Sequence, residues 1–213
     1  MNIDMNVYIK LFLIMTPTLY TILLSIIPII TKELELFIIL VNYVLFGKIF
    51  NSLEKSAFKF IQGENSKIGK RPNPIGSKLF NNKYDKCSIP INILKPWKLK
   101  LVDKDYYSKG NKPTWGFPSG HSQESSFVAT ILTLYLINND KKNKNIYIIL
   151  LWILNILVMS QRVYAGCHTL LQVIVGDLFG ILFGILSYYQ ICHRFFPDKF
   201  PTDNTNKIFN IKN

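Results

Sequence analysis

The sequence has few of the residues that build metal sites and disulfide frameworks. Its 213 residues include only three cysteines, Cys87, Cys167 and Cys192, which form no Cys-x-x-Cys pair and no Cys-x5-Arg phosphatase loop. An odd number without paired spacing predicts neither a zinc site nor a disulfide framework, and it leaves the redox compartment undecided. No dense group of carboxylates suggests magnesium binding. We therefore expect neither a metal nor another cofactor.

Acidic residues are also scarce, since 13 Asp and Glu stand against 25 Lys and Arg and the formal net charge is +12. A basic excess suits nucleic acid, anionic lipid or an acidic substrate. The basic residues here flank apolar runs instead of forming one soluble basic face, so we expect no nucleic-acid partner. With 49% hydrophobic and 18% charged residues, the composition fits a membrane protein whose charges lie in loops, with the lipid bilayer as a partner.

The first long apolar run covers residues 11–30. The residues before it lack a basic region, and the run lacks the small-residue cleavage pattern of a signal peptide. At about 20 residues it is long enough to cross a bilayer. We expect a retained span that Pro17 and Pro28 bend or end, as membrane helices tolerate.

Four more apolar runs follow, and the longest stretch between them is basic. We expect spans over residues 36–50 with a helical continuation to 61, then over 119–137, over 146–159 with an extension to 162, and over 170–191. The segment 62–115 is rich in Asn, Lys, Pro and Gly, and its short apolar pieces and aromatic residues suit the membrane interface. The prediction is an all-α, polytopic membrane helical bundle of about five spans with a long basic interfacial loop, forming a single domain over 1–213.

Glycines recur at four-residue spacing in the last span, at Gly176, Gly180 and Gly184. Small residues at this spacing let a second membrane helix approach closely. We expect these glycines to serve packing and not chemistry.

The segment Trp-Gly-Phe-Pro-Ser-Gly-His, ending at His121, stands directly before the third predicted span. Free backbone N–H groups and the positive end of the helix dipole favour a phosphate at a helix N-terminus. Gly120 lets an anion approach the backbone next to Ser119. His121 would lie beside that anion as a proton donor. Such a turn is often only a helix cap, so a second cluster is needed to support a function.

That second cluster is Arg162 followed by His168, between the fourth and fifth predicted spans. Five spans put both clusters on one face of the membrane. Arg162 and Arg71 can grip phosphate oxygens in a bidentate manner. His168 can attack phosphorus while His121 protonates the leaving oxygen. Cationic side chains would supply the charge stabilisation, which agrees with the expected absence of a metal.

The order Arg71-Pro72, then Pro-Ser-Gly-His at 118–121, then Arg162-x5-His168 resembles the three motifs of the type-2 phosphatidic acid phosphatase superfamily. The resemblance covers about residues 51–184. It implies a lipid phosphatase in which His168 is the nucleophile and His121 the general acid. It also implies that Arg71, Ser119, Gly120 and Arg162 bind phosphate.

Two positions depart from that pattern. The first motif of the superfamily has a lysine seven residues before its Arg-Pro arginine, and here that residue is Glu64. Lys59 is the candidate for the displaced lysine, with Lys67 next. The superfamily also has an aspartate four residues after the nucleophile, and here that residue is Gln172. On a helix the two positions share a face, so Gln172 can orient His168 through its amide oxygen but cannot stabilise an imidazolium by charge.

The glutamine is itself informative, because the third motif and the Ser-Gln after the second are similar to those of the dolichyl-diphosphatase branch. That similarity implies hydrolysis of a polyprenyl diphosphate to the monophosphate on the lumenal side of the endoplasmic reticulum. Basic residues on the face away from the motifs support this orientation. The alternatives are a lipid monophosphate phosphatase, a phosphotransferase, and a catalytically silent membrane protein that binds anionic lipid or partners.

Overall fold

The computed structural model describes residues 5–63, 66–72, 115–140 and 142–204, and the ordered elements in this part of the chain are helices. This confirms the all-α prediction. Several helices continue into one another, so that Leu34–Gln62 and Leu170–His193 each form one long rod. The elements are α1 (Met5–Thr31), α2 (Leu34–Asn42), the π-helical η1 (Tyr43–Ile49), α3 (Phe50–Gln62), α6 (Gly120–Asn138), α7 (Lys144–Tyr164), α8 (Leu170–Leu186) and the π-helical η4 (Ser187–His193).

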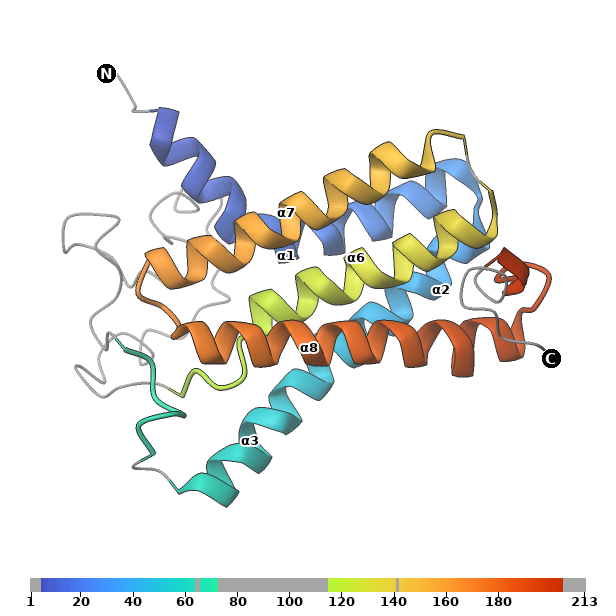
Figure 1. The fold of residues 1–213 in the computed structure, drawn as a ribbon. Helices are drawn as coiled ribbons and strands as arrows, with labels where there is room; N and C mark the ends of the chain where they lie inside the picture. The colour runs from blue at the N-terminus through green and yellow to red at the C-terminus, as the bar shows by residue number, and fades with distance from the viewer. Residues whose placement is uncertain (1–4, 64–65, 73–114, 141, 205–213) are drawn as a thin grey trace.

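The helix α1 covers the run that the sequence predicts as the first span. It continues through Pro17 and Pro28 without ending, and Figure 1 shows a clear bend along it. A proline removes one backbone hydrogen bond and clashes with the preceding turn, which bends a helix without necessarily stopping it. Of the two expectations for these prolines, bending is confirmed for the helix and termination is wrong.

Three rods are long and apolar enough to cross a membrane, namely Leu34–Gln62, Lys144–Tyr164 and Leu170–His193. Their outward faces carry exposed aliphatic residues, as on α8 at Leu171, Leu178 and Leu182. Such surfaces suit lipid and not water. The expected integral membrane bundle is therefore confirmed.

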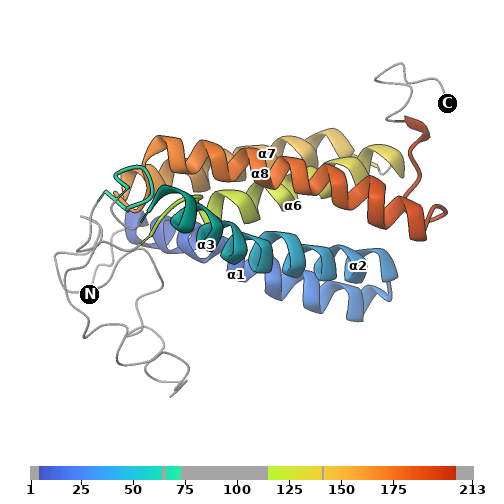
Figure 2. The ribbon, with the colours of Figure 1, turned by 90° about the horizontal axis from the view of Figure 1, so that it is seen from below.

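The helix α6 is the centre of the bundle. It contacts α1, η1, α7, α8 and η4, and Figures 1 and 2 both place it among the other rods. Phe127 and Ile131 are fully buried, and so are the polar Ser122 and Ser126. Because its neighbours shield it from lipid, α6 can carry serines where an outer span needs aliphatic residues.

The glycine ladder of α8 packs against α6, as predicted. A side chain at Gly180 would overlap Ser126 Oγ and the carbonyl oxygen of Gln123, and one at Gly176 would overlap the carbonyl oxygen of Ser119. Ser126 Oγ also donates to the Asp177 carbonyl oxygen at 2.9 Å. This contact holds the start of α8 against the start of α6, where the candidate site lies.

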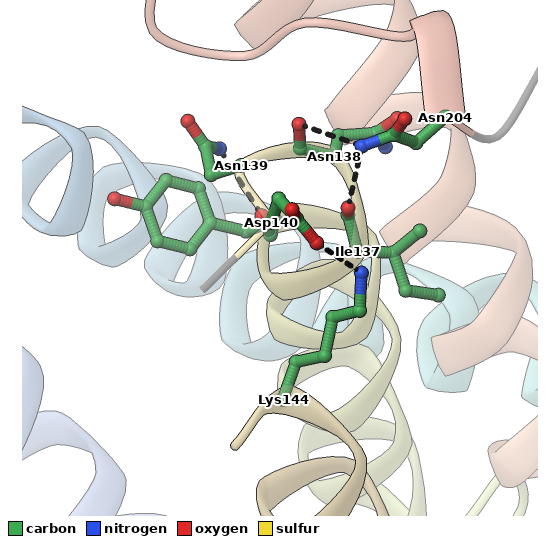
Figure 3. Close-up of polar contacts among 7 residues, drawn as sticks. Ile137, Asn138, Asn139, Asp140, Lys144 and Asn204 are labelled. Atoms are coloured by element: carbon green, nitrogen blue, oxygen red, sulfur yellow. Dashed lines mark hydrogen bonds and ion pairs between the residues drawn. The ribbon is translucent and has the colours of Figure 1, made fainter. Parts of the chain in front are cut away.

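The opposite end of the bundle is closed by the C-terminal segment (Figure 3). Asn204 Nδ2 donates to the carbonyl oxygens of Ile137 and Asn138, at 3.1 and 3.4 Å. These carbonyls belong to the last turn of α6, where a helix leaves its acceptors unpaired. Lys144 Nζ and Asp140 Oδ1 form an ion pair of 2.5 Å across the turn into α7.

All the predicted motifs lie at the other end. The ends of α3 and α7 and the starts of α1, α6 and α8 are together there in Figures 1 and 2. Both histidine clusters therefore lie at one end of the bundle, as expected because the two helices α6 and α7 separate them along the chain. The predicted basic interfacial segment, 62–115, lies mostly outside the described residues, which include only 62–63, 66–72 and Trp115 of it.

Candidate active site

Backbone hydrogen bonds join the three motif segments. Gly116 N–H donates to the carbonyl oxygen of Gly69 at 2.7 Å, next to an isolated antiparallel bridge between Lys70 and Trp115. Ser119 N–H donates to the carbonyl oxygen of Gln172 at 3.0 Å. The segment before Arg71, the segment before His121 and the first turn of α8 therefore form one frame.

His168 lies in the tight turn between α7 and α8. Gly166 has a positive φ of 69°, a conformation that glycine adopts without steric cost. The N–H groups of Cys167 and His168 both donate to the Arg162 carbonyl oxygen, at 3.1 and 3.3 Å. His168 is 2% exposed. The turn thus fixes the imidazole relative to Arg162.

The hydrogen bonds of Gln172 determine which nitrogen of His168 carries the lone pair. Gln172 Nε2 donates to two carbonyl oxygens, so the other end of the amide must be Oε1. Thr169 N–H donates to this oxygen at 3.2 Å, and His168 Nδ1 lies 3.2 Å from it. An amide oxygen only accepts, so Nδ1 carries the proton. Nε2 of His168 is therefore the nitrogen with a lone pair, as a nucleophile requires.

Gly116 is a site residue that the sequence did not reveal. A Cβ at this position would lie 2.7 Å from Arg71 Cγ, 2.8 Å from Gln172 Oε1 and 3.3 Å from His168 Nδ1. Arg71 and His168 thus converge on one backbone position that has no room for a side chain. The only signal in the sequence was that this glycine stands just before Phe-Pro-Ser-Gly-His. In the structure the peptide bond between Phe117 and Pro118 is cis.

Three cationic side chains, Arg71, Arg162 and Lys55, lie within electrostatic range of both histidines. Arg162 is completely buried at the start of the turn that carries His168. His121 is within electrostatic range of Arg162, His168, Arg71 and Lys55. Burial, reinforced by Arg71, Arg162 and Lys55, lowers the pKa of His168 well below its usual value of 6.5, against a smaller opposing effect of Gln172. His168 is therefore neutral at pH 7.

This shift predicts a pH-dependent stability. Unfolded His168 takes up a proton below about pH 6.5, whereas folded His168 does not. The free energy of unfolding should therefore decrease as the pH is lowered, by up to about 1.4 kcal/mol per pH unit from this group. The measurement is the melting temperature of the detergent-solubilised protein between pH 7.5 and 5. The decrease should be smaller in His168→Asn. An identical decrease in that variant would contradict the shift.

Only some of the backbone N–H groups at the start of α6 are available to bind an anion. Ser119 is the N-cap residue and is fully buried, and its Oγ accepts from Ser122 Oγ at 3.0 Å. Its own N–H is used by Gln172. The backbone donors that can face a phosphate are therefore those of the first helical turn, from Gly120 onward.

Lys55, which the sequence analysis did not select, lies at the start of α6. A Cβ on Gly120 would lie 3.4 Å from Lys55 Nζ and 2.8 Å from Asn51 Oδ1. Lys59, one turn farther along α3, is exposed, and Lys67 is exposed in the segment that follows. Geometry thus favours Lys55 over Lys59 as the lysine of the first motif.

The lysine pair allows a matched test. Lys55→Met should lower kcat/KM by about 10- to 100-fold, the loss expected for one charge-assisted hydrogen bond to phosphate. Lys59→Met removes the same charge from the same helix and should cost less than about threefold, as exposed substitutions do. Phosphate release under subsaturating substrate measures both. The reverse order would restore Lys59 as the motif lysine.

Polar side chains of α3 and η1 make hydrogen bonds to the first turns of α6, next to His121. Asn51 Nδ2 donates to Gln123 Oε1 at 2.5 Å, and Gln123 Nε2 donates to the Phe46 carbonyl oxygen at 3.2 Å. Tyr43 Oη donates to Glu124 Oε2 at 2.6 Å. Farther along α8, Asp177 accepts from Asn155 Nδ2 at 2.8 Å. Within the described ranges, no group of three or more His, Cys, Asp or Glu side chains lies close enough to hold a metal ion.

Cys167, directly before His168, is disulfide-bonded, whereas Cys192 is a free, buried thiol. The sequence analysis predicted no disulfide framework, and it did not anticipate this single bond. An odd cysteine count does not exclude one bond plus one free thiol, and the pairing is not visible as a short sequence spacing.

Comparisons with known proteins agree with the motif geometry. The model of the PAP2 superfamily matches residues 88–195, which include His121, Arg162 and His168. Phosphatidylglycerophosphatase B of Bacillus subtilis (strain 168) is 31% identical over 94 residues, which are 42% of this chain and 45% of that protein. Dolichyldiphosphatase 1 of Dictyostelium discoideum is 34% identical over 95 residues, 42% of each chain. The chain thus spans less than half the length of these relatives, and no solved structure matches it.

Proposed function

This chain belongs to the PAP2 superfamily, and from this membership we propose that it hydrolyses a phosphorylated membrane lipid through His168. The observation that carries the proposal is the fixed tautomer of His168, whose imidazole lies within electrostatic range of Arg71, Arg162 and Lys55. A neutral imidazole held in one tautomer is prepared to attack phosphorus. The whole chain acts as one integral-membrane unit, because α6 and α8 carry the site and also form the bundle core.

The reaction would proceed in two displacements. Nε2 of His168 forms a bond to the terminal phosphorus while the bond from phosphorus to the bridging oxygen breaks, and His121 gives that oxygen a proton. Water then attacks the phosphohistidine, passes a proton to His121, and releases inorganic phosphate. Arg71, Arg162, Lys55 and the N–H groups of the first turn of α6 would stabilise the phosphoryl oxygens, so that metal ions are not required.

The preferred substrate is a polyprenyl diphosphate of the dolichyl type. Support comes from the Gln172 variant of the third motif, from Ser122-Gln123 after the second, and from the match to a protein named dolichyldiphosphatase. The match to a protein named phosphatidylglycerophosphatase supports a lipid monophosphate as the second candidate. The product of the first reaction would be a polyprenyl monophosphate and inorganic phosphate.

His121 offers a way to separate these substrates. A diphosphate releases a phosphate monoester, which leaves without much help, whereas a monophosphate releases an alkoxide that needs the proton of a general acid. Purified protein in EDTA should release phosphate from polyprenyl diphosphate faster than from phosphatidylglycerophosphate. His121→Gln should slow monophosphate turnover more than diphosphate turnover. Preference for the monophosphate would select the second candidate, and equal release by wild type, His121→Gln and His168→Asn would leave a silent lipid-binding protein.

We also propose that the site faces the lumen of the endoplasmic reticulum. Disulfides persist in oxidising compartments, and Cys167 lies in the nucleophile turn. Cys192, which lies at the other end of the bundle, is a free thiol and takes no part in this bond. A protein disulfide of the lumenal oxidation system would take up the two electrons and two protons of the thiols. Lys142, Lys144 and Arg194, at the opposite end, fit the cytoplasmic side.

Two measurements test the orientation. Peptide mapping without reductant should find Cys167 in a disulfide and Cys192 as a free thiol. A tag inserted at residues 142–143 should be accessible from the cytoplasm in sealed microsomes. A tag protected in sealed microsomes, or Cys167 alkylated as a free thiol in protein isolated with its thiols blocked, would contradict a lumenal site.

A further inference from the structure

Gln172 contacts all three segments of the site. Its side chain meets His168 and the segment 66–72, and its carbonyl oxygen accepts from Ser119 N–H at 3.0 Å. Its own N–H donates to Thr169 Oγ1 at 3.2 Å, which completes a capping box at the start of α8. The side chain is completely buried.

The amide group is fully used. Nε2 donates to the carbonyl oxygens of Ile68 and Lys70, at 2.7 and 2.9 Å. Oε1 accepts from Thr169 N–H and lies 3.2 Å from His168 Nδ1. An amide has two N–H donors and two acceptor positions, and here each has a partner. Lys70 directly precedes Arg71, so the nitrogen end holds the backbone next to the phosphate-binding arginine.

We propose that Gln172 is a positioning residue whose amide nitrogen fixes the Arg71 segment relative to the nucleophile. The proposal rests on the function proposed above and deepens it. A role limited to orienting His168 needs only the oxygen of the amide. The two hydrogen bonds from Nε2 indicate a second role for Gln172. They fix the distance between Arg71 and His168, so that both side chains can contact the same phosphoryl group.

A carboxylate cannot perform this task. An ionised Asp or Glu is an acceptor only, so in place of Nε2 it would face the Ile68 and Lys70 carbonyl oxygens without a proton between them. Buried acceptors without donors are costly. Gln172 is therefore not simply a weaker version of an aspartate that orients the histidine. Gln172 lacks the negative charge that would stabilise an imidazolium, but its amide nitrogen makes hydrogen bonds to the first-motif segment that a carboxylate cannot make.

The decisive substitution is Gln172→Glu, which keeps the shape and the acceptor for His168 Nδ1 and removes both donors. If the oxygen alone matters, the added charge should leave activity unchanged or raise it. We expect instead that KM for the lipid diphosphate rises by about 10- to 100-fold, as for the loss of buried hydrogen bonds, with a smaller change in kcat.

A double-mutant cycle ties this effect to the arginine. Arg71→Gln should raise KM strongly in the wild type and only slightly in Gln172→Glu, because the arginine is already misplaced there. Gln123→Glu is the matched control, since it makes the same chemical change at a buried glutamine that does not contact the Arg71 segment. Additive effects of Gln172→Glu and Arg71→Gln would overturn the proposal, as would equal coupling of Gln123→Glu to Arg71→Gln.

Hydrogen exchange supplies a readout that does not depend on catalysis. Amides of residues 66–72, followed by mass spectrometry in detergent, should exchange faster in Gln172→Glu than in wild type or Gln123→Glu. Gln172→Asn, a milder change, serves if Gln172→Glu does not fold. Unchanged exchange in a folded variant would contradict the positioning role even if the protein is an active phosphatase. Faster exchange in a protein without phosphatase activity would support the positioning role and overturn only the proposed function.

Discussion

Replacing His168 with asparagine is expected to lower kcat by about 10⁴-fold or more, the scale of loss when a covalent nucleophile is removed. The structure leaves no second imidazole in that turn, and His121 belongs to a different helix. Asparagine retains a polar side chain near Gln172 Oε1, so the fold should survive. Phosphate release at saturating lipid substrate measures the loss.

The third histidine provides the control for this prediction. His193 ends η4, and its Nδ1 lies 2.7 Å from the carbonyl oxygen of Phe200, at the opposite end of the bundle. His193→Asn makes the same change far from the site and should keep near-normal kcat in protein that folds. If the His168→Asn variant were as active as the His193→Asn variant, His168 would not be the nucleophile.

The second large effect is expected for Arg162→Lys, with a fall in kcat/KM of about 100-fold. Arg162 is completely buried, and its carbonyl oxygen anchors the turn that carries His168. Lysine keeps the charge, but it cannot grip two phosphate oxygens through a planar fork. The effect should therefore come from lost geometry and not from lost charge.

Arg194→Lys is the matched substitution, because Arg194 is exposed beyond η4 at the far end. It should change kcat/KM by less than about threefold, as exposed substitutions do. If Arg162→Lys were equally mild, a point charge would suffice at this position, and bidentate binding of the phosphoryl group by Arg162 would be wrong.

The sequence predicted the bundle well because its signals are local. Apolar runs of spanning length marked the rods, and the spacing of Gly176, Gly180 and Gly184 marked the face of α8 that meets α6. Because two predicted spans separate His121 from His168, the sequence also placed both histidines at the same end of the bundle. Each of these inferences uses only the length and periodicity of one segment.

The parts that the sequence did not predict depend on contacts between distant segments. Lys55 and Lys59 share a helix and a charge, and only the packing of α3 against Gly120 distinguishes them. The two bonds from Gln172 to the Arg71 segment join residues about a hundred positions apart. Gly116 and the bond at Cys167 are equally invisible from spacing. The amide at Gln172 was expected to weaken the site, but its nitrogen has partners that sequence patterns do not show.

The central claim is that His168 Nε2 takes the phosphoryl group of a membrane lipid. Protein mixed with lipid diphosphate labelled in its terminal phosphate, and quenched within one turnover, should carry an alkali-stable, acid-labile phosphate on the peptide that contains His168. The label should be absent from His168→Asn and present in His193→Asn. Label on another residue, or turnover of the lipid with no labelled protein at any quench time, would contradict the account.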